Sequence, residues 1–151
     1  GYGAVIGTIS LIISGILAIN EIQKQKPRVN VKLSVGFMFD LQQNRSEALI
    51  IVQAINTGRG SIVLNTFGFL LKDGAELVIH NPNMFQLPHT LDERRRFNAY
   101  FACRSFRENE NQDNISKVFF RDETNTVWKA RLTRKLRKEI LQSSNKGYKV
   151  T

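Results

Sequence analysis

The stretch VNVKLSVGFMF, residues 29–39, alternates apolar side chains with other residues from end to end. A period of two places every second side chain on the same face of an extended chain, so this stretch is predicted to be a half-buried strand. A second stretch, residues 48–55, is almost entirely apolar, which is typical of a central strand. The two stretches together indicate a core built on a sheet.

Turn signals separate these strands from others downstream. The hexapeptide NTGRGS at 56–61 contains two glycines, and Asp73-Gly74 is a hairpin signal. Further strands are predicted at 62–71, 77–79, 97–106, 115–121 and 127–132, with a loop at 80–89. About seven short strands joined by turns favour a mainly-β, immunoglobulin-like β-sandwich over residues 29–132.

The periodicity changes after this region. Leu132, Leu136 and Ile140 recur at intervals of four, which is the spacing of one face of a helix. The sequence therefore predicts a short, basic amphipathic helix over residues 133–143, followed by a tail over 144–151.

The N-terminal region has a different composition. Residues 2–19 carry no side chain that is charged at neutral pH, and an 18-residue helix spans about 27 Å, close to the ~30 Å core of a bilayer. We predict a single transmembrane helix over residues 1–22 and a basic juxtamembrane linker over 23–28. A buried core helix would need a larger domain around it, and no small-residue cleavage site for a signal peptide follows Leu17. Since the chain starts at Gly1 rather than Met, we expect residues upstream.

The flanking charges predict the orientation in the membrane. Lys24, Lys26, Arg28 and Lys32 follow the apolar run, against one nearby acid, Glu21. Basic residues beside a membrane span are retained in the cytoplasm, so we expect a single-pass protein of the inner membrane with a cytoplasmic C-terminal domain. The presence of only one cysteine agrees with a reducing compartment.

Small residues follow one seam of the predicted membrane helix. At alternating intervals of four and three, the seam contains Gly3, Gly7, Ser10, Ser14, Leu17 and Glu21. Small side chains allow helix backbones to approach closely in lipid, so the seam predicts a homo-oligomer. With the seam facing inward, Glu21 would form an acidic ring at a cation-conducting pore. The alternative is a lone anchor in which Glu21 is an interfacial residue.

Catalytic and metal-binding patterns are lacking. His80 and His89 lie in one predicted loop, and no Cys-x-x-Cys or His-Glu-x-x-His spacing occurs. Cys103 falls in an apolar strand pattern, which favours a core position. We therefore predict neither an enzyme nor a bound metal or cofactor.

The charge of the chain indicates an anionic partner. All 22 Lys and Arg residues lie after residue 20, against 13 acids, which gives a net charge of +9. Charge runs usually form a solvated face, and anionic lipid would also attract a basic domain. Abundant arginine favours phosphate contacts instead. The predicted polyanion-binding residues are Arg94, Arg95, Arg96, Lys129, Arg131, Arg134, Lys135, Arg137 and Lys138.

The overall plan resembles that of known small proteins. An N-terminal helix, the V-x-V-x-L-x-V pattern from Val29 to Val35, Asn56-Thr57-Gly58, and VL-x-x-x-GF from Val63 to Phe69 resemble bacterial membrane-anchored β-sandwich proteins. Among these, the membrane effector of Hailong-type anti-phage systems has a similar layout. The resemblance implies an ion channel controlled by single-stranded DNA, and a partner nucleotidyltransferase. It carries no functional residue over to this chain.

Three function classes remain open. The first is an oligomeric membrane effector, a candidate ion channel, that binds single-stranded DNA or a nucleotide messenger. The second is a membrane-anchored scaffold that binds another protein through its β-sandwich. The third is a sensor of anionic lipid that uses the C-terminal basic helix as a second membrane contact.

Overall fold

The computed structural model describes residues 28–39, 41–42 and 44–145. Within these residues the chain is mainly β, with two sheets and a short C-terminal helix. None of the helices described is long and apolar enough to cross a bilayer. The predicted membrane helix at 1–22, residues 23–27 of the predicted linker and residues 146–151 of the predicted tail lie outside the described part.

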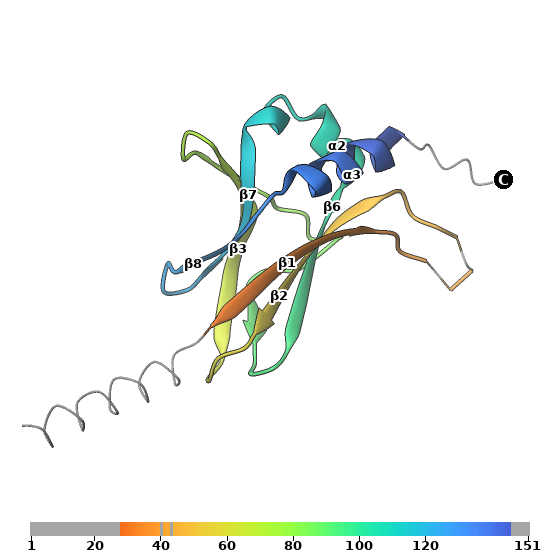
Figure 1. Ribbon diagram of the computed structural model, residues 1–151. Helices are drawn as coiled ribbons and strands as arrows, with labels where there is room; N and C mark the ends of the chain where they lie inside the picture. The colour runs from red at the N-terminus through yellow and green to blue at the C-terminus, as the bar shows by residue number, and fades with distance from the viewer. Residues whose placement is uncertain (1–27, 40, 43, 146–151) are drawn as a thin grey trace, which may run out of the picture.

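The strands form a three-stranded and a five-stranded sheet (Figure 1). Their bounds are β1 Val29–Gly36, β2 Leu49–Asn56, β3 Ile62–Leu71, β4 Glu76–Val78, β5 His89–Leu91, β6 Arg96–Ala102, β7 Ile115–Asp122 and β8 Val127–Arg131. The first sheet has the order β1-β2-β6, and the second has the order β4-β3-β7-β8, with β5 also paired to β3. All of the pairings are antiparallel.

The inner faces of the two sheets share one core. On β2, Ile50, Val52 and Ala54 are buried at alternate positions, as the period-two pattern requires. The facing sheet contributes Phe67 and Phe120, whose ring centroids lie 5.1 Å apart. As predicted, β2 is the central strand of its sheet.

Gly68 allows two strands to approach each other closely. A Cβ at this position would lie 2.2 Å from the backbone oxygen of Leu77 and 3.0 Å from the ring of Phe119. The backbone oxygen cannot move away without disturbing the β3–β4 pairing, so only glycine fits here.

Several elements differ from those predicted, and the strand predicted over residues 29–39 ends at Gly36. The strand predicted over 97–106 ends at Ala102, where helix α2 begins and continues over Cys103–Glu108. Cys103 and Phe106 are both buried and lie three residues apart, a helical spacing that a run of apolar residues conceals. The loop predicted at 80–89 ends one residue early, because His89 begins the short strand β5. A 3-10 turn, η1, covers Gln112–Asn114.

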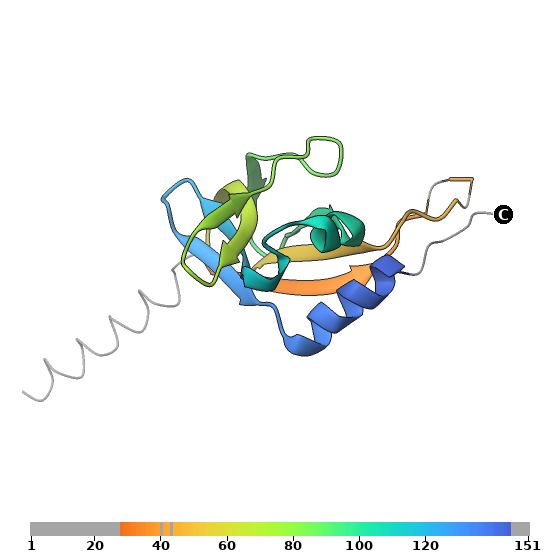
Figure 2. The same ribbon diagram turned by 90° about the horizontal axis from the view of Figure 1, so that it is seen from above.

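Helix α3, over Arg134–Asn145, closes the domain. It begins one residue later and ends two residues later than predicted. Thr133 lies just before it, and its hydroxyl accepts a hydrogen bond from the backbone of Leu136 (3.2 Å), which satisfies a free amide of the first turn. Figure 2 shows α3 beside β1, and α3 also contacts α2. Ile140 is buried in this packing.

The β1–β2 connection forms an arm that projects beyond the sheets (Figures 1 and 2). Phe39 and Arg45 form an isolated antiparallel bridge in this arm, and the guanidinium of Arg45 lies 3.5 Å from the ring centroid of Phe37. Near the tip, Phe39 is 68 % exposed and Leu41 is fully exposed.

Candidate polyanion interface

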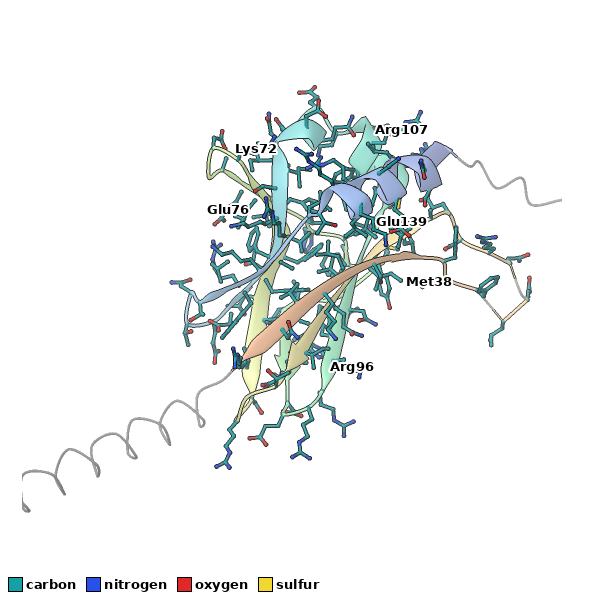
Figure 3. The ribbon with its side chains drawn as sticks, viewed as in Figure 1. Met38, Lys72, Glu76, Arg96, Arg107 and Glu139 are labelled. Atoms are coloured by element: carbon teal, nitrogen blue, oxygen red, sulfur yellow. The ribbon has the colours of Figure 1, made fainter. Side chains whose placement is uncertain are left out.

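The structure separates the predicted polyanion-binding residues into two groups. Arg94 and Arg95 lie between β5 and β6, and Arg96 begins β6, at the end of the domain where β1 begins. The remaining residues lie on β8 and α3. Figure 3 shows this separation, because Arg96 lies at one end of the domain and Arg107, on α2 beside α3, lies at the other.

The group on β8 faces away from the core. Trp128 and Ala130 pack inward, so the alternate residues Lys129 and Arg131 are exposed on the outer face. Lys117 of β7 occupies the same face and pairs with Arg131 in the strand register. With the outward side chains of α3, these residues form what we call the β8–α3 basic surface: Lys117, Lys129, Arg131, Arg134, Lys135 and Lys138.

Lys117 and Arg131 place two positive charges directly opposite each other. Within the described residues, neither side chain forms an ion pair or a hydrogen bond. Glu76 lies on β4, two strands away from β7 in the same sheet, and its carboxylate is paired with Arg121. Like charges directly opposed in a ladder are destabilising, and neither side chain has an ion-pair partner within the described residues to offset the repulsion.

A groove of about 420 Å³ borders this surface, where β1, β8 and α3 meet. Lys32, Arg131 and Lys135 contribute cations to its lining, and Glu139 contributes a carboxylate. Sequence reasoning missed Lys32 as part of this site. The alternation of the sequence places Lys32 on the polar face of its strand. Its closeness to β8, however, depends on how the two sheets pack.

Arg137 was predicted to bind a polyanion, but its guanidinium is engaged inside the protein. Nη1 donates a hydrogen bond to the backbone oxygen of Gln112 (2.5 Å), and Nη2 donates one to the backbone oxygen of Ile115. The same guanidinium carbon lies 5.9 Å from the ring centroid of Phe106. Arg137 therefore joins α3 to η1, β7 and α2, and both of its terminal guanidinium nitrogens donate hydrogen bonds within the protein.

At the opposite end of the domain, the buried side chain of Asn56 organises three chain segments. Its amide nitrogen donates to the backbone oxygens of Gly60 (2.8 Å) and Leu91 (3.0 Å), and its oxygen accepts from the backbone of Gly58 (3.1 Å). Its backbone oxygen also accepts a hydrogen bond from the Arg94 amide (2.8 Å). The side-chain nitrogen and oxygen of Asn56 therefore both have hydrogen-bond partners, as a residue that is 0 % exposed requires.

This arrangement gathers five exposed arginines. The backbone oxygen of Arg28 accepts hydrogen bonds from Thr57 (2.8 Å) and Gly58 (3.2 Å), which brings the start of β1 to the loop that carries Arg59. We call the arginine end the set Arg28, Arg59, Arg94, Arg95 and Arg96. All five are exposed, and none has an ion-pair partner among the residues that the structure describes.

Asp122 is a buried carboxylate at the same end, 5 % exposed. One oxygen accepts from Thr124 through its amide (2.8 Å) and hydroxyl (2.6 Å), and from the Thr126 amide (3.1 Å). The other oxygen accepts from Trp128 Nε1 (3.1 Å). Burial acts to raise the pKa of this carboxyl, but the hydrogen bonds outweigh it and hold the pKa below its ordinary value. These contacts shape the β7–β8 turn.

The other reactive side chains are engaged in packing. Burial, with a smaller effect from Glu47, raises the pKa of Cys103 to about 11, so the thiol is protonated at neutral pH. Cys103 lies in the core, as predicted. The ring of His89 stacks on Phe97 with centroids 4.6 Å apart. No group of three or more His, Cys, Asp or Glu residues is placed to hold a metal within the described part of the chain.

The predicted membrane seam, from Gly3 to Glu21, lies outside the described residues. Comparison with protein-family models, curated proteins and solved structures gives no match. Fold, charge and packing are therefore the basis for assigning a function to this chain.

Proposed function

We propose that this chain is an oligomeric membrane effector whose immunoglobulin-like domain binds an anionic ligand on the β8–α3 basic surface. The ligand class is single-stranded DNA or a nucleotide messenger. In this proposal, residues 1–22 anchor the protein in the inner membrane as a candidate cation channel, the domain is cytoplasmic, and a nucleotidyltransferase makes the messenger. No catalytic residue is assigned.

The strand order supports the immunoglobulin-like part of the proposal. A sheet β1-β2-β6 that faces a sheet β4-β3-β7-β8 is built from antiparallel hairpins joined by crossovers between the sheets. This is a Greek-key arrangement of the kind found in immunoglobulin-like sandwiches. Such domains present binding residues at their loops and outer faces, while the core serves packing.

The observation that best supports the binding function is the repulsion between Lys117 and Arg131, two opposed cations that have no ion-pair partner within the described residues. A ladder without a ligand is more stable when one of two opposed cations is replaced. A phosphate between them would turn the repulsion into two attractions, and Arg131 also lines the adjacent groove. The surface is therefore suited to an extended anion that contacts several cations at once.

A salt series tests this proposal. Single-stranded DNA should bind the full chain in detergent, with an affinity that falls steeply as salt is raised. Replacing both Lys117 and Arg131 with Gln should lower the slope of log affinity against log salt by about 1.4, at roughly 0.7 per lost contact. The matched control is Lys72→Gln, an exposed lysine of the β3–β4 turn (Figure 3), which should leave the slope unchanged.

Equal slopes for the double variant and Lys72→Gln would remove this surface as the ligand site. A titration with cyclic or linear oligonucleotide messengers distinguishes the two ligand classes, because a short messenger neutralises fewer cations and gives a smaller slope.

The membrane part of the proposal has its own test. Gly7→Leu or Ser14→Leu should shift the complex in detergent toward monomer, because bulky side chains keep the helix seams apart. In bilayer recordings, Glu21→Gln should change the cation conductance, whereas loss of the β8–α3 cations should change gating only. Unchanged mass in both seam variants would place the oligomer interface elsewhere.

A second function, a membrane-anchored protein scaffold, is favoured by the arm between β1 and β2. Met38, Phe39 and Leu41 are exposed on a projecting hairpin rather than buried. Apolar side chains concentrated on a projection are typical of protein-binding sites. If Phe39→Ser with Leu41→Ser abolishes oligomers while the seam variants do not, the arm and not the membrane helix holds the assembly together.

A further inference from the structure

The five residues of the arginine end lie where the chain enters the domain from its predicted membrane helix. We propose that the arginine end binds the phosphate groups of anionic lipids, and so fixes the domain upright on the membrane with the β8–α3 basic surface facing away. This inference rests on the membrane anchor in the proposed function. It assigns Arg94, Arg95 and Arg96 a ligand different from that of the β8–α3 basic surface.

Chain length limits how far the arginine end can be from the lipid. Six peptide steps separate residue 22, the end of the predicted span, from Arg28, and fully extended they reach about 20 Å. The backbone hydrogen bonds of Asn56 and Arg28 bring Arg59, Arg94 and Arg95 to the same end. The attraction of cations to anionic lipid acts within about one Debye length, ~8 Å at physiological salt.

The α3 part of the other basic surface lies farther from the lipid in the same orientation. Lys32 is three residues beyond the start of β1, and it lines the groove together with Lys135 of α3. An antiparallel strand rises about 3.4 Å per residue, so α3 meets β1 roughly 10 Å along the strand. That distance already exceeds one Debye length of ~8 Å, so an upright domain places the arginine end closer to the headgroups than α3.

The backbone of Arg94 is the second supporting observation. Arg94 lies in a turn closed by a hydrogen bond from the Arg95 amide to the Asp92 oxygen (3.1 Å), and its φ is +61°. This left-handed conformation favours glycine or asparagine at the third position of a turn. A long cationic side chain at such a position carries a conformational cost, and costs of this kind concentrate at binding sites.

The carboxylates at this end do not neutralise the arginines. Asp92 accepts a hydrogen bond from the Ser61 hydroxyl (2.7 Å), and Glu93 accepts one from the Gly60 amide (2.5 Å). Both side chains thus fasten the loop at 57–61 to the turn at 92–95. Glu123 is exposed on the neighbouring turn. With the buried Asp122, four acids lie at this end, and none of them forms an ion pair with the five arginines in the described part of the chain.

Hydrogen–deuterium exchange on the full chain in lipid nanodiscs tests the proposal. Discs of phosphatidylcholine are compared with discs that also contain phosphatidylserine. We expect amides at 57–61 and 92–96 to exchange at least about fivefold more slowly with phosphatidylserine, since each arginine near the surface contributes about that factor. Amides of α3 should not change. Replacing Arg94, Arg95 and Arg96 with Gln should remove the difference.

Three variants control this experiment. Replacing Arg134, Lys135 and Lys138 with Gln removes the same charge from the far end and should keep the phosphatidylserine effect. Arg94→Gly removes a cation and relieves a positive φ, so it should reduce the effect without unfolding the domain. Asn125→Gly also relieves a positive φ (+65°) at this end without a change of charge, and it should keep the effect.

Several outcomes would overturn the inference. A chain that stays in the disc but exchanges equally in both lipids would remove it and leave the anchor intact. Protection of α3 in place of the 57–61 and 92–96 amides would show a domain lying on its side. Protection of the arginine end by single-stranded DNA in neutral discs, lost in the Arg94–Arg96 variant, would make this a nucleic-acid site. A chain that does not remain with the discs would refute the anchor itself, and this inference with it.

Discussion

The arginine end and the β8–α3 basic surface are both exposed and cationic, but different structures support them. The arginine end is held by a neutral amide, Asn56, which joins the loop at 57–61 to the end of β5 through backbone groups. The far end rests on a cation, Arg137, which joins helix to sheet through backbone oxygens. Clusters of basic residues that look equivalent in sequence can therefore mix exposed side chains with structural ones. The following substitutions test that difference.

Asn56→Ala should have the largest effect. It removes three hydrogen bonds at a fully buried position and leaves the oxygens of Gly60 and Leu91 unpaired, so we expect the free energy of unfolding to fall by about 3 kcal/mol. Asn98→Ala is the matched control, because that amide donates only one long bond, 3.4 Å to the Tyr100 hydroxyl. Denaturant titration of both variants measures the difference. Similar losses would show that the loops at the arginine end do not depend on Asn56.

Arg137→Gln should destabilise the far end by about 2 kcal/mol, because two charge-assisted hydrogen bonds to backbone oxygens are lost. Its neighbour Lys138 is exposed, and Lys138→Gln should change stability by less than about 0.5 kcal/mol. Arg137→Lys keeps the charge but loses the planar fork, and should fall between them. If Arg137→Gln affects polyanion affinity and not stability, the structural role assigned to this residue is wrong.

Asp122 gives the arginine end a dependence on pH. Because the pKa of this carboxyl is lowered in the folded protein, its contribution to stability is present above the unfolded pKa of about 3.9 and is lost as pH falls through the lower folded value. Asp122→Asn replaces a charged acceptor of hydrogen bonds from Thr124, Thr126 and Trp128, so it should cost about 1 kcal/mol at neutral pH. It should also flatten the dependence of stability on pH below about pH 4. Trp128→Phe removes one of the hydrogen bonds and should weaken the same dependence. If the free energy of unfolding depends on pH in the same way in Asp122→Asn and in the parent, Asp122 is not the source of this dependence.

The smallest effect has the opposite sign. Lys117→Gln removes one of two opposed cations and should stabilise the free domain by about 0.2–1 kcal/mol while it weakens polyanion binding. Lys72→Gln should change neither property. A domain destabilised by Lys117→Gln would show that the Lys117–Arg131 pair is not repulsive, and the case for the β8–α3 basic surface would lose its main support.

Much of the fold follows from sequence patterns. Alternation on β1, the apolar run of β2 and the Asp73-Gly74 turn each predict a local structure that is found. The pattern misleads at Cys103–Phe106, where a spacing of three residues within an apolar run is compatible with either helix or strand. It also misses the start of β5 at His89, because a three-residue strand depends on its neighbour β3 rather than on its own composition.

The candidate sites are less predictable, because they depend on contacts between distant segments. Arg137 and Lys138 are adjacent cations on one helix, and only the position of the Gln112 and Ile115 oxygens distinguishes their roles. The repulsion at Lys117 depends on the register of β7 with β8, which neither strand specifies alone. Charge counting therefore identifies basic segments but cannot say which of their residues face a ligand.

The pairing of β1 has a mechanical consequence for a tethered domain. β1 follows directly on the N-terminal region and pairs with β2 from Val29–Asn56 to Gly36–Leu49. The hydrogen bonds of an antiparallel ladder run perpendicular to the strands. A pull on the tether along β1, with the far end of the domain held, therefore loads all of these bonds together in shear rather than breaking them one by one. If the proposed anchor and ligand exert such a pull, the first strand of the domain is placed to transmit the tension without unravelling.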